Sequence, residues 1–196
     1  MANNKRRRLI LASSSPRRRE LLEKLGCSFQ VMPSQVGESI NEALAPDEYV
    51  KELSRLKALN VASRVSNGII IAADTVVVLD GVILGKPETS EKAQQMLRAL
   101  SGKEHQVVTG VVVVDAKTKM MEQEVVTTNV KFRKLSDNLI NRYVDTGEPL
   151  DKAGAYAIQG KGALLVESIE GCYYNVVGLP LVTVSKLLEG FGAGLI

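Results

Sequence analysis

Charged and hydroxyl side chains occur at several places in this chain where their types and spacing could do chemistry. Asp74 and Thr75 lie inside an otherwise apolar stretch from Ile69 to Leu79. A carboxylate in such a stretch must be paired, bind a metal ion or be protonated. The structural alternative is an aspartate at a strand end that accepts hydrogen bonds from backbone N–H groups. The cations in neighbouring segments favour the first reading.

The second place is a predicted helix start, where Ser15 is a suitable N-cap and Pro16 a suitable first residue. Backbone N–H groups and the helix dipole attract anions at such a start and disfavour cations. Arginines here therefore indicate a bound anion, and guanidinium groups match phosphate oxygens. We interpret Arg17 and Arg18 as phosphate ligands and Arg19 as part of an exposed charged face.

Two lysines and a loop carboxylate complete the set. Lys57 lies in the apolar stripe of a helix predicted over about residues 47–65, where it either extends outward along its stem or points its ammonium into a wet cleft. Lys86 comes after the apolar stretch that contains Asp74, and Glu38 lies in a predicted loop. Cations and carboxylates of this kind stabilise phosphate charge, hold a divalent cation and orient a water for attack on phosphorus.

Composition narrows the function classes. With 196 residues, 45% of them apolar, the chain can form a full core, and we predict one domain, 1–196, with two lobes and a flexible basic tail over residues 1–8. A net charge of +3 and only 4% aromatic residues fit a small polyanion better than nucleic acid. Neither a membrane-spanning run nor a signal peptide is recognisable.

Cysteine and histidine usage adds two limits. Cys27 and Cys172 are far apart and form no CxxC motif, which indicates reduced thiols in a cytosolic protein. His105 is the only histidine, so a His-rich zinc site is excluded and any metal is a hard cation held by oxygen. A P-loop motif is also absent.

Helical and strand patterns both occur along the chain. The predicted strands cover 9–12, 29–32, 69–79, 106–115 and 122–132, the last two forming a hairpin, and the predicted helices begin near residues 16, 47, 90, 137 and 181. Glycines interrupt residues 149–181, where either tight turns near a ligand or an irregular connection would explain them.

Four sequence blocks resemble the signature blocks of the Maf nucleotide pyrophosphatases, and they occur in the same order along the chain. They are LASSSPRR (11–18), ADTVV (73–77), GKP (85–87) and GEPLDKAGAYAIQG (147–160). The resemblance spans nearly the whole chain. It implies an α/β fold similar to the inosine triphosphatases, with an elongated mixed β-sheet flanked by helices and two lobes with a central cleft. It also implies hydrolysis of nucleoside triphosphates to the monophosphate and pyrophosphate.

The resemblance assigns roles position by position. Asp74 matches the catalytic carboxylate and, with Glu38, the metal-binding positions. The phosphate-binding positions match Ser13, Arg18, Lys57 and Lys86. The positions associated with the subfamily that acts on dTTP and UTP match Arg17, Thr75 and Gln159. Ala157 departs from the family, where glycine is more usual, and adds a methyl group near the presumed base pocket.

The resemblance further implies a divalent metal cation (Mg²⁺ or Mn²⁺), a homodimer, a cytoplasmic location, and no nucleic-acid or membrane partner. The alternative function is a non-catalytic nucleotide-binding regulator of cell division or septum formation. A pure binder does not require Asp74, Glu38 and Lys86 together.

Overall fold

The protein, described here from a computed structural model over residues 7–37 and 44–195, has a mixed α/β fold. Its seven-stranded sheet has the order β2-β1-β3-β5-β6-β7, with β4 paired to β3. The strands are β1 (Leu9–Leu11), β2 (Phe29–Val31), β3 (Ile69–Leu79), β4 (Val82–Leu84), β5 (Glu104–Asp115), β6 (Met121–Phe132) and β7 (Val166–Glu170). The α-helices are α1 (Pro16–Lys24), α2 (Pro46–Ala62), α3 (Ser90–Leu100), α4 (Asp137–Val144), α5 (Tyr173–Val177) and α6 (Leu181–Gly190).

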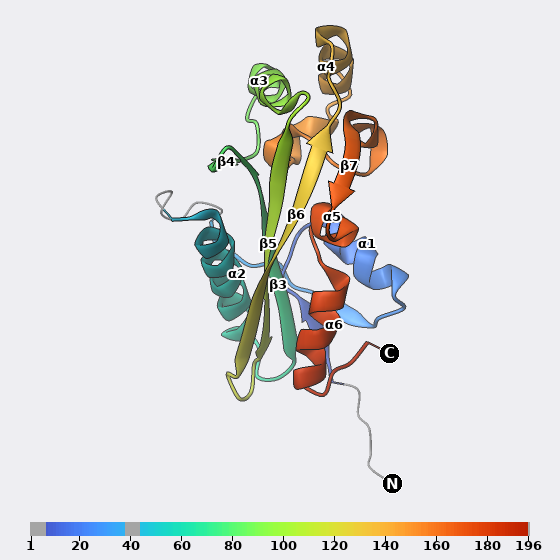
Figure 1. Ribbon diagram of the computed structural model, residues 1–196. Coiled ribbons are helices and arrows are strands. Elements are labelled where there is room, and N and C mark those ends of the chain that lie inside the picture. The colour runs from blue at the N-terminus through green and yellow to red at the C-terminus, as the bar shows by residue number, and fades with distance from the viewer. Residues whose placement is uncertain (1–6, 38–43, 196) are drawn as a thin grey trace. The chain divides into compact units, whose positions relative to one another are not determined.

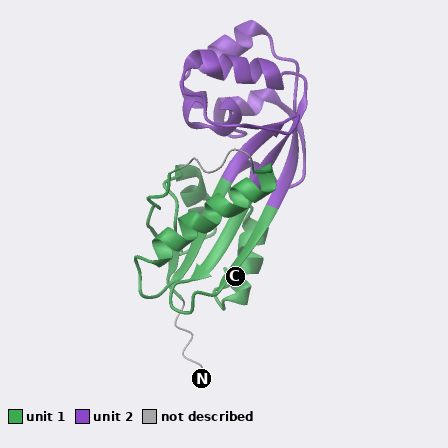
Figure 2. Cartoon of the chain, turned by 90° about the vertical axis from the view of Figure 1, so that its left-hand side faces the viewer, with its two compact units in different colours: residues 1–74, 110–125, 178–196 green, residues 75–109, 126–177 purple. Residues whose placement is uncertain are grey.

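The chain forms two compact units (Figure 2). Unit 1 contains residues 1–74, 110–125 and 178–196, and unit 2 contains residues 75–109 and 126–177. The chain passes from unit 1 to unit 2 within β3, between Asp74 and Thr75.

In unit 1, β1 is parallel to both β2 and β3, and Leu11 pairs with Ile71. Helix α2 lies on one side of these strands, and α1 and α6 lie on the other (Figure 1). Strands covered on both faces read as continuous apolar runs, and β3 is buried from Ile69 to Ala73. The apolar side of α2 packs with alternate strand residues, in a cluster that includes Ala58, Val61, Ile70 and Ala72.

Gly110 permits the close approach of α2 to β5. A Cβ atom at this position would lie 2.4 Å from the Val50 carbonyl oxygen and 2.9 Å from Ser54 Oγ. Because the first of these neighbours is backbone, no side-chain rotation could relieve the overlap. A residue without a side chain is therefore required where the helix crosses the strand.

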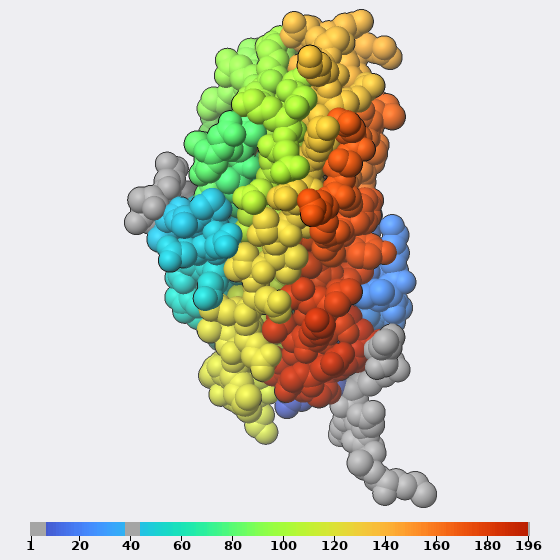
Figure 3. All heavy atoms as spheres, viewed as in Figure 1, coloured from blue at the N-terminus to red at the C-terminus, as the bar shows by residue number. Residues whose placement is uncertain are grey.

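In unit 2, an apolar cluster joins β3, β5 and β6 to α3, α4 and the turns that follow α4. Strand β6 alternates over its last residues, where Thr128, Val130 and Phe132 are buried and Lys131 is exposed. The exposed side of residues 121–132 is visible as the yellow surface in Figure 3. Three 3-10 helices, η1 (Glu148–Asp151), η2 (Ala153–Ala155) and η3 (Gly160–Leu165), lie in the glycine-rich segment.

The α/β class and the main elements were predicted correctly, but two elements were missed. The glycine-rich segment contains β7 and α5, neither of which was predicted. Of the predicted basic tail, residues 1–6 lie outside the described residues, and Arg7 Nη1 donates to Asp115 Oδ2 at 2.8 Å. Arg8 likewise binds the Gln30 side chain. Among the described residues, no helix has the length and apolar character needed to cross a membrane.

Candidate active site

The carboxylate of Asp74 is paired with a lysine from the neighbouring helix. Residues 70, 72 and 74 of β3 point to the same face, because side chains alternate along a strand, and α2 packs on that face. Lys57 of α2 donates from Nζ to Asp74 Oδ1 at 2.6 Å. The two side chains are only 11% and 13% exposed. Lys57 therefore points inward rather than outward along its stem.

The arginine-rich helix start brings Ser13 and Arg18 together. Ser15 caps α1 as predicted, its side chain accepting from the Arg18 backbone N–H at 3.5 Å. The Arg18 guanidinium donates from Nη1 to Ser13 Oγ at 3.3 Å and from Nε to the Gly178 carbonyl at 2.7 Å. The side chain is thus fixed from two segments distant in sequence. Arg17 is half-buried on the same helix.

Strand register relates this loop to Asp74. In the parallel β1–β3 pair, Leu11 lies opposite Ile71, and the Ala12 N–H donates to the Ile71 carbonyl at 2.8 Å. Ser13 and Asp74 therefore both follow the carboxyl ends of this pairing. Ligands of α/β sheets bind at this kind of edge.

Unit 2 holds the predicted positions Thr75, Lys86 and Gln159. Thr75 shares a hydrogen bond of 2.9 Å with Thr109, between their Oγ1 atoms. Thr109 in turn donates to the Asn175 carbonyl at 3.4 Å. The buried Asn175 side chain donates to the Val107 carbonyl at 2.9 Å and to Thr128 Oγ1 at 3.0 Å. This network ties Thr75 to α5, and sequence reasoning missed Asn175 because no motif marked it.

The remaining predicted residues differ in their surroundings. Gln159 is half-buried, in extended backbone just before η3. Lys86 is exposed between β4 and α3. Glu38, predicted as a metal ligand, lies outside the described residues.

His105 has a structural environment. Its ring contacts Phe132 and Tyr156 edge to face, and its Nε2 shares a 2.8 Å hydrogen bond with the Tyr156 hydroxyl. Burial lowers the pKa of His105 to about 4. The residue is therefore neutral at physiological pH, and its contacts are those of the unit 2 core.

The described residues contain no cluster of three or more His, Cys, Asp or Glu side chains suited to a metal ion. A cage made entirely by these residues is therefore not available. Asp74 does supply a carboxylate beside phosphate-binding candidates. One or two carboxylates plus substrate phosphates are the usual ligands of Mg²⁺ in nucleotide enzymes, and the donor set fits that arrangement.

Comparisons with known proteins identify the family. Residues 8–191 match the model of the family described as Maf-like protein. The chain belongs to this family. Among the relatives of this Maf-like protein, the dTTP/UTP pyrophosphatase of Carboxydothermus hydrogenoformans is 50% identical over 177 residues, which cover 90% of this chain and 95% of the relative. The dTTP/UTP pyrophosphatase of Alkaliphilus oremlandii is 51% identical over 175 residues, covering 89% and 91%.

Among solved structures, the Staphylococcus aureus Ham1 protein matches this Maf-like protein with a TM-score of 0.52 and 15% identity. The match covers 94% of this chain and 99% of that one. At this identity the likeness concerns the fold alone, and it confirms the predicted α/β class with a mixed sheet flanked by helices.

Proposed function

We propose that this Maf-like protein is a nucleoside triphosphate pyrophosphatase that hydrolyses dTTP and UTP to the monophosphate and pyrophosphate. The observation that carries the proposal is the buried Lys57–Asp74 pair, because it places an oriented carboxylate inside the ADTVV block. Relatives of about this length that are 50% and 51% identical are named for the same activity.

Asp74 is the proposed catalytic group. Its carboxylate accepts the proton of a water, or orients that water, for attack at the α-phosphorus, and the bond to the bridging oxygen of pyrophosphate breaks. Lys57 fixes the carboxylate through the 2.6 Å hydrogen bond. A positioned carboxylate costs little reorganisation in the transition state, which is the usual source of such electrostatic catalysis.

The phosphates are assigned to Ser13, Arg18 and Lys86. Arg18 is held by the Gly178 carbonyl and by Ser13. Its guanidinium group therefore binds the substrate without a large loss of side-chain entropy. Lys86 is an exposed point charge suited to the departing pyrophosphate.

A divalent cation, Mg²⁺ or Mn²⁺, is the proposed cofactor, with Asp74 and Glu38 as its protein ligands. When bound, it would neutralise charge that develops on the phosphate oxygens. The homodimer and the cytoplasmic location implied by the family resemblance stay predictions.

Base choice is assigned to Gln159, Thr75 and Arg17. A glutamine amide offers one acceptor and one donor group, and it can therefore pair with the imide edge that thymine and uracil share. A site that leaves buried polar groups unpaired with the wrong base discriminates against that base.

The test is to incubate the pure protein with a panel of triphosphates and Mg²⁺ or Mn²⁺ and to measure pyrophosphate. We expect pyrophosphate from dTTP and UTP at rates well above those from purine triphosphates. Tight binding of dTTP without pyrophosphate would instead support the non-catalytic regulator.

A further inference from the structure

We infer that Glu148 and Tyr143 form a clamp that fixes the backbone on both sides of Gln159 and thereby sets the base preference of the enzyme. The inference rests on the proposed function, because it concerns how the proposed base-reading residue is positioned. Glu148 and Tyr143 are positioning residues in this account, since neither is assigned a contact with the substrate. We call the two side chains the Glu148–Tyr143 clamp.

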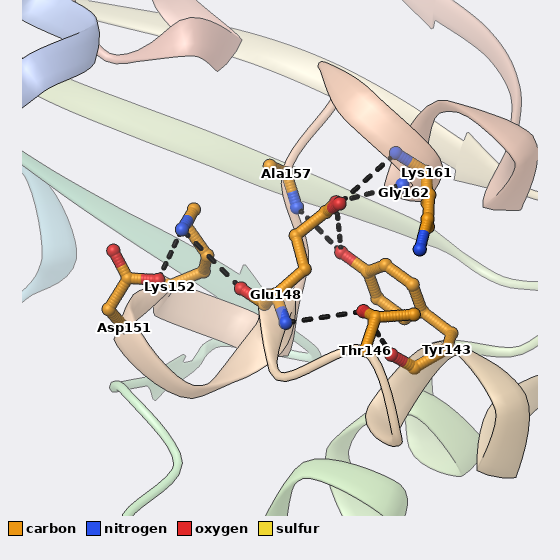
Figure 4. Close-up of polar contacts among 8 residues, drawn as sticks. All are labelled: Tyr143, Thr146, Glu148, Asp151, Lys152, Ala157, Lys161 and Gly162. Carbon is orange, nitrogen blue, oxygen red and sulfur yellow. Dashed lines mark hydrogen bonds and ion pairs between the residues drawn. The ribbon is translucent and has the colours of Figure 1, made fainter.

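The carboxylate of Glu148 binds the segment after Gln159 (Figure 4). Its Oε1 accepts from the Gly162 N–H at 3.0 Å, and its Oε2 accepts from the Lys161 N–H at 3.1 Å. Hydrogen bonds from backbone N–H groups to a carboxylate are charge-assisted and stronger than neutral ones. Both carboxylate oxygens thus hold the backbone that follows Gln159.

The hydroxyl of Tyr143 binds the segment before Gln159. It donates to Glu148 Oε1 at 2.9 Å and accepts from the Ala157 N–H at 3.3 Å. Burial, together with the hydrogen bond to Glu148, raises the pKa of Tyr143. The hydroxyl therefore stays protonated and keeps donating to the carboxylate. Ala157 and Lys161 flank Gln159 by two residues on each side, so one connected group holds both ends of this short segment.

Close packing shows that the clamp fits this segment specifically. A Cβ atom at Gly162 would lie 2.2 Å from the Ala157 carbonyl oxygen and 2.6 Å from the Tyr143 hydroxyl. A Cβ atom at Gly160, where φ is +69°, would lie 2.9 Å from Glu148 Oε2. The two glycines are therefore needed for the segment to fold over the clamp.

The clamp is itself supported from α4 and η1. The Glu148 N–H donates to Thr146 Oγ1 at 3.2 Å, and Thr146 Oγ1 donates to the Tyr143 carbonyl at 2.7 Å. Lys152 Nζ donates to the Glu148 carbonyl at 3.4 Å and pairs with Asp151. In Figure 4 these groups surround the base of the Glu148 side chain, while its carboxylate extends toward Lys161 and Gly162.

The test compares E148A, E148Q and Y143F with wild type, using kcat/KM for dTTP and for dCTP. We expect E148A to lower the dTTP:dCTP ratio of kcat/KM by about tenfold, with most of the loss in KM for dTTP. E148Q keeps one acceptor oxygen and should lower the ratio less than E148A does. Y143F should also give a ratio between those of E148A and wild type. The matched control is E167Q, which removes an exposed carboxylate of unit 2 paired with Lys131 at 3.3 Å. It should leave the ratio unchanged.

A double variant separates positioning from general support of the fold. If the clamp acts through Gln159, E148A should change the ratio little when introduced into Q159A, because coupled residues are not additive. Additive losses in the double variant, or an unchanged ratio in folded E148A, would overturn the inference. If circular dichroism shows that E148A is not folded, the dTTP:dCTP ratios of E148Q and Y143F test the inference instead.

The experiment distinguishes a failure of the clamp inference from a failure of the proposed function. A wild-type protein that releases no pyrophosphate from any triphosphate contradicts the proposed function. The dTTP:dCTP ratio of dissociation constants in the same variants would then test the clamp. Active wild type with unaltered selectivity in the clamp variants contradicts the clamp alone.

Discussion

Lys57 Nζ and Asp74 Oδ1 lie 2.6 Å apart, in a pair whose side chains are almost fully removed from solvent. Removing one member of such a pair leaves the other as a buried, uncompensated charge. We expect K57M and D74N each to lower the free energy of unfolding by about 1–3 kcal/mol. The double variant should be more stable than the sum of the single changes predicts.

Urea denaturation of the four proteins measures this coupling. The control is the exposed Lys131–Glu167 pair, whose side chains are 48% and 50% exposed. Its coupling should be about 0–1 kcal/mol because solvent screens it. Equal coupling energies for the two pairs would show that the buried geometry gives Lys57 and Asp74 no special role.

Gly110 supports a second prediction, on the packing of the helix that carries Lys57. G110A places a methyl group 2.4 Å from the Val50 carbonyl oxygen, so α2 must move or the backbone must strain. We expect a loss of about 2 kcal/mol or more in the free energy of unfolding. G37A is the matched control, because nothing lies within 4 Å of its added Cβ. Thermal melts in which the two variants have equal midpoints would contradict the close approach.

The sequence predicted the elements whose signals are local. The Ser15-Pro16 start of α1 depends on neighbouring residues, and it is confirmed. Strand β7 was missed because frequent glycines dominate the local pattern, while its pairing partner is the distant β6.

The candidate site was predictable only in part. The motif blocks marked Asp74, Arg18 and Ser13 as candidates, yet the direction of Lys57 depended on which face of β3 meets α2. The clamp was missed for a related reason: Glu148 is separated from Lys161 and Gly162 by 13 and 14 residues, and only the folded turns bring them together.

Because His105 is buried, we expect the stability of the folded protein to depend on pH in the acid range. Burial lowers its pKa from 6.5 to about 4, so between these values the unfolded chain binds more protons than the folded one. Stability therefore falls as the pH is lowered through this window, by about 2 kcal/mol between pH 7 and pH 5. Chemical denaturation of wild type and H105Q at the two pH values measures the effect. A pH dependence in H105Q as steep as that of wild type would assign it to other groups.

Replacing Arg18 by lysine should lower kcat/KM, even though the positive charge is kept. Its guanidinium donates to the Gly178 carbonyl at 2.7 Å and to Ser13 Oγ at 3.3 Å, and a lysine cannot reproduce this fork. We expect R18K to lower kcat/KM for dTTP by about tenfold to a hundredfold. R19K is the control, because Arg19 is exposed and pairs with Glu23 on the same helix. Steady-state kinetics in which R18K matches R19K would remove Arg18 from the phosphate site.

Hydrolysis of dTTP in ¹⁸O-labelled water, by wild type and by D74N, is the most direct measurement of the proposed chemistry. Attack on the α-phosphorus places the label in thymidine monophosphate and leaves the pyrophosphate unlabelled. D74N should remain folded and lose about a hundredfold or more in kcat, because the amide cannot accept the proton of the water. Label in pyrophosphate, formation of dTDP and orthophosphate, or turnover by folded D74N at the wild-type rate would contradict the assignment of Asp74 and of the α-phosphorus.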